Sequence, residues 1–297
     1  MDFGACVLQP ADGEPVEATV RGKLMGPRKS LGNALVVGDV AHYVEEGGRV
    51  VVTGVEPRRN SFSRKEAGER VEEQVVAANL DQVVVVAALV DPPFRAGLVD
   101  RMLCQAEHAG LPARVVINKC DLVPETEPHE LLEDYVRAGY PAHRVSAKTG
   151  EGVEALRHAC RGRRSLFAGH SGVGKSTLLN ALAPGIDLLA GLVNPRTGKG
   201  RHTTSAAWLI TPEPDLELVD TPGIRAFGLW GIGPRDLDQA WPEFRRLLGD
   251  CRFADCRHET EPGCAIRTAA EAGEISARRW ESFRKLRAEL EREGARR

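Results

Sequence analysis

The sequence predicts an α/β fold in which a parallel sheet forms the central domain, with a small β-rich domain before it and a mainly helical domain after it. Residues 83–90 and 115–117 are continuous apolar runs, the pattern of strands buried on both faces of a sheet. Amphipathic helical stretches alternate with these runs, at residues 98–109, 130–137 and 151–159. The first 75 residues instead hold short apolar runs broken by Gly and Pro, which predicts the β-rich domain.

Composition bounds the class of protein. The 297 residues are 42% hydrophobic and 28% charged, enough apolar material for two or three folded domains. A net charge of −2 argues against a uniformly basic nucleic-acid wrapper and leaves local basic patches possible. No apolar run approaches the roughly 18 residues of a membrane span, and the N-terminus lacks a signal-peptide pattern. We therefore expect a cytoplasmic monomer without a membrane partner, whose isolated cysteines (Cys6, Cys104, Cys120 and Cys160) are free thiols.

The β-rich segment predicts a small antiparallel barrel of the OB type. Its apolar runs fall at residues 16–20, 34–37, 40–44 and 50–55. Barrels of this type commonly hold nucleic acid on one face and its loops. Two basic clusters fall in predicted loops, at 21–29 and 58–65, and the second contains Phe62, as phosphate contact with base stacking would use. An RNA-binding patch and ordinary solvated loop charge are equally open interpretations.

A phosphate loop lies in the middle of the chain. The stretch is Gly169-His170-Ser171-Gly172-Val173-Gly174-Lys175-Ser176-Thr177, which fits G-x-x-x-x-G-K-[ST] without a gap. A short apolar strand at 166–168 precedes it and a helical pattern at 178–182 follows it, as the motif requires. Backbone N–H groups of such a loop converge on a phosphate, Lys175 can bridge the β- and γ-phosphates, and Ser176 can ligate Mg²⁺. The sequence therefore predicts a nucleoside triphosphate site.

Two further motifs indicate which base is bound. Asn118-Lys119-Cys120-Asp121 follows the apolar run at 115–117, and Ser146-Ala147-Lys148 follows a short strand near 143–145. The carboxylate of Asp121 can accept hydrogen bonds from N1–H and the exocyclic amine of guanine, a donor pair that adenine lacks. The second motif suits a backbone N–H contact with the guanine O6. We therefore expect GTP and GDP as ligands.

Residues after the phosphate loop supply candidates for the γ-phosphate and the magnesium ion. Residues 185–201 are rich in Gly and Pro and predict a mobile loop, which ends beside Thr203 and Thr204. One of these threonines can close on Mg²⁺ and the γ-phosphate; an N-cap or strand-edge hydroxyl is the alternative. Strands at 207–210 and 217–219 lead to Asp220-Thr221-Pro222-Gly223, where Asp220 would hold Mg²⁺ through water and the Gly223 N–H would sense the γ-phosphate. We therefore assign Lys175, Thr204 and Gly223 as the candidate catalytic residues for transfer of the γ-phosphoryl group.

A cysteine cluster predicts a structural zinc site near the C-terminus. Cys251, Cys256, His258 and Cys264 follow the pattern Cys-x4-Cys-x-His-x5-Cys. Three thiolates and one imidazole form a closed tetrahedral set for one Zn²⁺. The alternative is that three free cysteines lie close together by coincidence. A helix then begins after a predicted N-cap at Ser276, with an apolar stripe of Trp280, Phe283, Leu286 and Leu290. Its basic residues predict either a solvated face or an RNA contact.

The order of these motifs is unusual, because the base-reading motifs precede the phosphate loop. That order is a circular permutation of the GTPase domain. With a barrel in front and a cysteine cluster behind, nearly the whole chain resembles the ribosome small subunit-dependent GTPase A family, also called RsgA, YjeQ or EngC. The resemblance implies an OB barrel at 1–75, a permuted P-loop GTPase domain at 76–230 and a zinc-binding domain at 231–297. It also implies binding to the small ribosomal subunit and its 16S rRNA in late assembly, with GTP hydrolysis stimulated by the subunit.

Two positions depart from what hydrolysis and the family lead us to expect. Ile224 follows Gly223 where many GTPases place a glutamine that orients the attacking water, so we expect slow intrinsic hydrolysis. In some relatives a histidine follows Gly-Leu-Trp, whereas here Gly231 follows Trp230. We assign no general base. A GTP-binding RNA scaffold without significant turnover is the alternative function.

Overall fold

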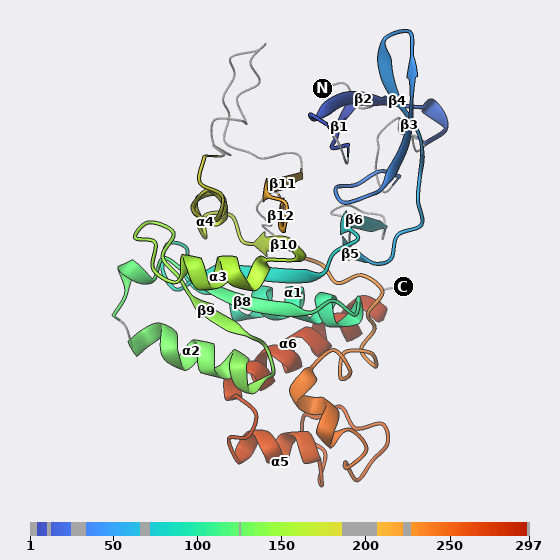
Figure 1. The fold of residues 1–297 in the computed structure, drawn as a ribbon. Coiled ribbons are helices and arrows are strands. Elements are labelled where there is room, and N and C mark those ends of the chain that lie inside the picture. The colour runs from blue at the N-terminus through green and yellow to red at the C-terminus, as the bar shows by residue number, and fades with distance from the viewer. Residues whose placement is uncertain are drawn as a thin grey trace.

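A computed structural model describes residues 5–10, 13–24, 34–65, 72–124, 126–185, 207–221 and 227–295 of the chain. A four-stranded sheet stands at one end of the molecule, the central sheet lies in the middle, and the C-terminal helices lie at the other end (Figure 1). Thr203, Thr204, Gly223 and Ile224 lie outside the described residues, as does the predicted mobile loop beyond Gly185.

The central sheet has six strands in the order β11-β12-β10-β7-β8-β9. Their bounds are β7 Gln82–Ala88, β8 Ala113–Asn118, β9 Ala142–Arg144, β10 Arg163–Gly169, β11 Trp208–Glu213 and β12 Leu216–Asp220. Five neighbouring strands run parallel, and β11 pairs with β12 in the antiparallel direction. All seven residues of β7 are buried. The prediction of a mainly parallel sheet covered on both faces is therefore confirmed.

The strand that enters the phosphate loop, β10, stands inside the sheet. The strands that precede it in the chain, β7, β8 and β9, lie on one side of it, and the later strands β12 and β11 lie on the other. The chain returns from the edge strand β9 to the interior strand β10 through helix α3 (Val153–Cys160). This strand order is that of a permuted domain, because the sheet is continuous although the base-reading half comes first in the chain.

Helices cover both faces of the sheet. On one face, α1 (Ala96–His108) packs on β7 and α2 (Thr126–Arg137) on β8 and β9, in one core with Val83 and Val85 of β7. On the other face, α3 and α4 (Lys175–Leu182) pack against Val84 and Val86. Successive side chains of a strand point to opposite faces, so one apolar run supplies two cores. These two cores hold the carboxyl edge of the sheet rigid, which is where the motifs lie.

The N-terminal sheet differs in two respects from the predicted antiparallel barrel. Its strands are β1 (Ala5–Leu8), β2 (Val16–Val20), β3 (Ala41–Glu46) and β4 (Arg49–Val55), in the order β1-β2-β4-β3, with a short 3-10 turn η1 (Gly22–Leu24) after β2. The pair β2 and β4 is parallel, so the sheet is mixed. Residues 34–37 form a turn and not a strand. There the Val36 N–H donates to Asp39 Oδ2 at 2.9 Å, which closes the turn.

The second basic cluster lies only partly in a loop, which covers its residues 58–60. Residues Ser61–Lys65 form β5, which pairs with β6 (Glu73–Ala78). Phe62 is fully buried and its ring lies 5.6 Å from that of Phe227, so the hypothesis that Phe62 stacks on RNA bases is wrong. The pairing of β5 with β6 places this aromatic ring in the hydrophobic core. The guanidinium of Arg58 is bound by both oxygens of Asp39, so it is already neutralised within the protein.

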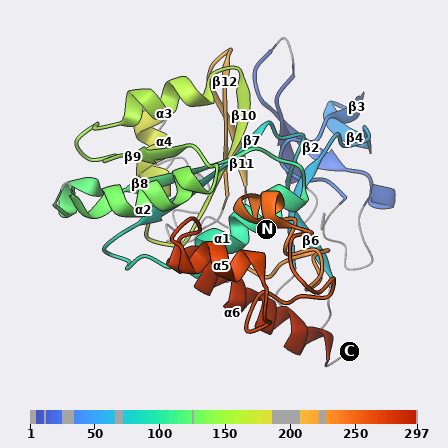
Figure 2. The same ribbon diagram turned by 90° about the horizontal axis from the view of Figure 1, so that it is seen from below.

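The C-terminal region packs against α1. It contains a 3-10 helix η3 (Pro242–Leu247), α5 (Ala265–Glu271) and α6 (Ala277–Gly294), and α6 lies beside α1 (Figure 2). Three members of the predicted stripe, Phe283, Leu286 and Leu290, are buried. Ser276 occupies the N-cap position, but its side chain makes no capping hydrogen bond. Among the described helices, none is both long and apolar enough to cross a bilayer.

Candidate functional site

Four predicted motifs meet at the carboxyl edge of the central sheet. Asn118 is the last residue of β8, and the short 3-10 turn η2 (Cys120–Leu122) follows it with Asp121. Ser146 follows β9, the phosphate loop joins β10 to α4, and Asp220 ends β12. Parallel strands align their carboxyl ends, so residues far apart in the chain reach one edge.

Asn118 joins the base-reading half of the site to the phosphate loop. Its Nδ2 donates to the carbonyls of Val173 at 2.9 Å and Gly174 at 3.4 Å. Its Oδ1 accepts from the Ala147 N–H at 3.1 Å. The side chain is buried, so these hydrogen bonds are shielded from water. Leaving any of the bonded groups unpaired would therefore reduce the stability of the fold. This one amide therefore joins β8 to two other backbone segments, the phosphate loop and the turn after β9.

Two glycines of the loop are required by close approach. Gly174 has φ +83°, and a Cβ there would lie 2.5 Å from Asn118 Nδ2. A Cβ at Gly169 would lie 2.4 Å from the Val86 carbonyl of the neighbouring strand. Contacts this short exclude any side chain. The glycines of the motif thus bring the loop against β7 and Asn118.

The carboxylate of Asp121 is held by the hydroxyl of Ser146, and the residue remains exposed to solvent. Its Oδ1 accepts from the hydroxyl of Ser146 at 2.6 Å, and that hydroxyl also accepts from the Thr149 N–H at 3.2 Å. The residue is exposed. Lys119 adopts the left-handed conformation with φ +62°, and its Nζ donates to the carbonyl of Asp91, a residue in the loop after β7. The carboxylate is thus oriented at the edge where a base can reach it.

Lys175 and Asp220 form a buried ion pair, with side chains 7% and 3% exposed. These are the two groups assigned to phosphate and to the magnesium shell. Thr221 anchors the end of β12 because its hydroxyl donates to the Phe167 carbonyl at 2.9 Å. Ser176 follows Lys175 in the first turn of α4. The arrangement fits a phosphate and a divalent cation, because each ligand would supply the counter-charge that Lys175 and Asp220 now supply to each other.

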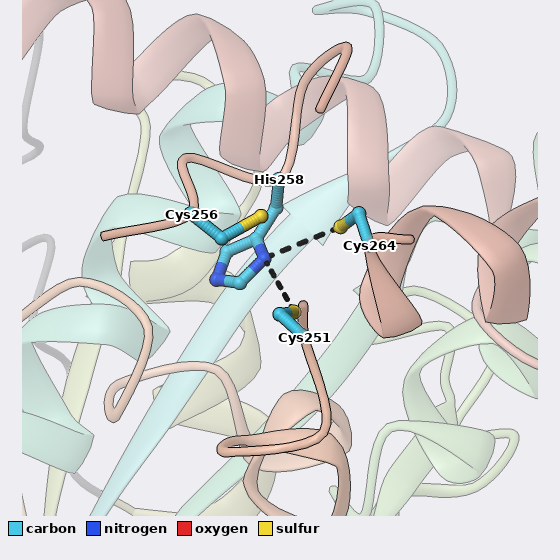
Figure 3. A group of neighbouring side chains, drawn as sticks. All are labelled: Cys251, Cys256, His258 and Cys264. Carbon is cyan, nitrogen blue, oxygen red and sulfur yellow. Dashed lines mark hydrogen bonds between the residues drawn. The ribbon is translucent and has the colours of Figure 1, made fainter. Parts of the chain in front are cut away.

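The predicted metal ligands form a second, separate cluster (Figure 3). The ligand atoms of Cys251, Cys256, His258 and Cys264 all lie within 4.8 Å of one another. His258 Nδ1 lies 3.6 Å from Cys251 Sγ and 3.4 Å from Cys264 Sγ. A tetrahedral zinc ion would place a nitrogen and a sulfur ligand about 3.5 Å apart. The four residues can therefore hold Zn²⁺ through Nδ1 and three sulfurs.

Two thiols of this cluster, those of Cys256 and Cys264, lie in a local environment that disfavours the free thiolate. Burial, together with the neighbouring thiols, raises the pKa of Cys256 to about 12, and burial raises the pKa of Cys264. Cys264 also caps α5, since its sulfur accepts from the Arg267 N–H at 3.3 Å. A bound cation would supply the charge that stabilises the thiolates.

Known proteins share these features over nearly the whole chain. A model of the RsgA GTPase family matches residues 55–230. A curated protein of Gemmatimonas aurantiaca, named small ribosomal subunit biogenesis GTPase RsgA, is 46% identical over 97% of this chain and 94% of its own length. The chain belongs to the RsgA GTPase family. A protein of the same name from Shewanella oneidensis is 36% identical over 96% of this chain and 80% of its own length.

Solved structures of YjeQ and YloQ agree with the fold of this RsgA-family chain. The crystal structure of YjeQ from Thermotoga maritima aligns with a TM-score of 0.72 and 33% identity, covering 96% of this chain and 94% of that one. YloQ, described as a circularly permuted GTPase, aligns with a TM-score of 0.69 over 98% of this chain and 92% of that one. YloQ is 22% identical, so it supports the fold alone.

Gly231, the residue that follows the Gly-Leu-Trp segment, lies beside the C-terminal end of α1. Gly231 has φ +72°, and a Cβ there would lie 3.1 Å from Nε2 of His108, the last residue of α1. The phosphate loop instead shares a small apolar cavity with Leu98, in the first turn of α1. The helix axis rises about 15 Å between Leu98 and His108. In this conformation Gly231 and the phosphate loop therefore lie beside opposite ends of α1.

Three contacts of the site were not found by sequence reasoning. The bridge made by Asn118, the pairing of Lys175 with Asp220, and a carboxylate beside His258, from Asp238, all join residues distant in the chain. The motif patterns contain each nucleotide-site residue but no signal for its partner. Asp238 lies outside every motif.

Proposed function

We propose that this RsgA-family chain binds GTP and hydrolyses it to GDP and phosphate during biogenesis of the small ribosomal subunit. The curated relatives carry that role in their names, and they match over most of this chain. The observation that carries the proposal is the bridge from Asn118 to both the phosphate loop and Ala147. That bridge gives one rigid frame for a guanine and a triphosphate together.

The residue roles follow from this frame. Asp121 reads guanine, the backbone of residues 146–148 lies beside the base, and the backbone of residues 169–177 cradles the phosphates, aided by Lys175. Ser176 and Asp220 hold Mg²⁺, with Thr203 or Thr204 completing its shell. Bound Mg²⁺ would neutralise charge that develops on the transferred phosphoryl group. The Lys175 ammonium, freed from Asp220, adds a second positive charge there.

We propose a low intrinsic rate of hydrolysis. Ile224 has no group that can orient a water, and the position of Gly231 lies at the opposite end of α1 from the phosphate loop. The missing group then comes from elsewhere in the chain or from the ribosomal partner. Ile224 also favours the rival function, a GTP-binding RNA scaffold with no significant turnover.

The other assignments complete the proposal. One structural Zn²⁺ is held by Cys251, Cys256, His258 and Cys264, and the match between their spacing and a tetrahedral set supports it. The partner is the small ribosomal subunit with its 16S rRNA. The three domains divide near residues 75 and 230. We also propose that the chain acts as a monomer in the cytoplasm.

Measuring phosphate release with and without purified small subunits tests the proposed function. We expect slow release from the protein alone and clear stimulation by small subunits, at saturating GTP and Mg²⁺. Large subunits serve as the control for non-specific ribosomal RNA. Nucleotide-dependent small-subunit binding without stimulated release would support the scaffold, and neither binding nor stimulation would reject both.

A further inference from the structure

We propose that Asp238 is a positioning residue of the metal cluster, which fixes the imidazole of His258 in its ligating orientation. The inference rests on the proposal that the cluster binds zinc. Asp238 precedes His258 by 20 residues in the chain and belongs to none of the sequence motifs. Its role is visible only in the folded chain.

The two nitrogens of His258 face different partners. Nδ1 lies 3.6 Å and 3.4 Å from the sulfurs of Cys251 and Cys264, whereas Nε2 lies 3.5 Å from Oδ2 of Asp238. In a neutral imidazole only one nitrogen carries a proton. A carboxylate beside Nε2 favours the tautomer with the proton there, which leaves the lone pair of Nδ1 directed at the sulfurs.

The carboxylate of Asp238 is itself held in place. Its other oxygen, Oδ1, accepts from Nη1 of Arg287 at 2.9 Å. The side chains of Arg287 and Asp238 are only 7% and 18% exposed. A charged pair with this little water around it has few other orientations. Arg287 belongs to α6, so this helix holds the carboxylate of Asp238, which in turn orients the imidazole of His258.

The remaining surroundings of His258 leave the ring little freedom. Its ring centroid lies 6.2 Å from those of Phe244 and Phe283, two buried aromatic residues. Its backbone adopts φ +62°, and its carbonyl accepts from the indole Nε1 of Trp280 at 3.3 Å. These contacts place the ring, and Asp238 selects which nitrogen faces the thiols.

The test is zinc retention in the purified full-length chain, measured as transfer of Zn²⁺ to a chromogenic chelator. For Asp238→Ala we expect zinc affinity to fall by about 10- to 100-fold, the usual effect of losing such a partner. Asp236→Ala is the matched control, since Asp236 binds the Gly233 N–H and not the cluster. It should retain zinc as the unaltered chain does.

A double variant separates this role from a general loss of stability. Asp238→Ala leaves Arg287 without this partner, so it can weaken the fold by another route. The double change Asp238→Leu with Arg287→Met removes both charges. We expect it to recover thermal stability relative to Asp238→Ala and still to lose zinc by a similar factor.

The possible outcomes are distinct. If the single and double variants both hold zinc as tightly as the unaltered chain, Asp238 does not position His258, while the zinc site itself stands. If the double variant recovers zinc affinity together with stability, the effect was structural and the inference is wrong. If the unaltered chain binds no zinc, the metal site and the inference both fail. The visible spectrum of the Co²⁺-substituted chain provides a second readout, which we expect to change in Asp238→Ala and not in Asp236→Ala.

Discussion

Arg279 of α6 and Asp100 of α1 form a buried ion pair, with 2.6 Å between Nη1 and Oδ1. Their side chains are 2% and 1% exposed. The same guanidinium binds both oxygens of Glu243 and lies 4.6 Å from the ring of Trp241. This cluster fastens the C-terminal region to a helix of the GTPase domain. A nucleotide-driven movement of the metal-binding region would therefore have to carry α1 with it or break these bonds.

Replacing Arg279 with methionine should destabilise the protein strongly. The change leaves Asp100 and Glu243 as buried carboxylates without their cation, so we expect a loss of about 3–5 kcal/mol in the free energy of unfolding. Urea denaturation at constant zinc concentration measures it. Arg284→Met is the control, because Arg284 pairs with Glu281 at an exposed position and should cost about 1 kcal/mol or less. Equal losses in the two variants would contradict a special role for Arg279.

Asn118→Ala should weaken binding of every guanine-type nucleotide without changing base preference. The change removes bonds to the Val173 carbonyl and the Ala147 N–H, and each buried partner left unpaired costs about 1–3 kcal/mol. Equilibrium titration with fluorescent GDP and its xanthine analogue measures both affinities. Asp121→Asn provides the contrast, since it should shift preference toward xanthine nucleotides. A change of base preference in Asn118→Ala would show that Asn118 reads the base directly.

Gly174→Ala should abolish nucleotide binding because the new methyl group collides with the amide of Asn118. Gly162→Ala is a matched control, since Gly162 also has a positive φ, +67°, but nothing lies within 4 Å of its Cβ position. Both changes should cost about 1–2 kcal/mol of stability from the left-handed backbone. Only Gly174→Ala should lose GDP in isothermal titration. Normal GDP affinity in that variant would mean that the loop binds phosphate without the support of Asn118.

His143 should make the protein less stable in weak acid. Burial, with the nearby Arg114 guanidinium, lowers the pKa of His143 from its ordinary value of 6.5 to about 4. The unfolded chain therefore takes up the proton more readily, so this contribution to stability is complete above pH 6.5 and is lost as pH falls toward 4. His143→Gln should flatten the fall in melting temperature over that interval. His129→Gln, the same change at an exposed position, is the matched control.

Local patterns in the sequence determined the motifs and the type of most elements. The predicted phosphate loop, guanine-reading aspartate and metal ligand set each depend on residues close together in the chain, so their spacing can be read directly from the sequence. The apolar runs at 83–90 and 115–117 correspond to β7 and β8, and the order of the motifs identified the permutation before any strand was placed.

Only the tertiary structure decided which residues meet. The basic residues and the aromatic at 58–65 have the composition of an RNA-binding surface patch. In the folded chain, however, Phe62 is buried in the core and Arg58 is paired with Asp39. The bridge from Asn118 spans 55 residues of chain to Val173, and Asp238 reaches His258 across a region with no shared motif. Such contacts arise because the parallel sheet aligns distant strand ends and because α6 packs along α1. No local pattern encodes either arrangement.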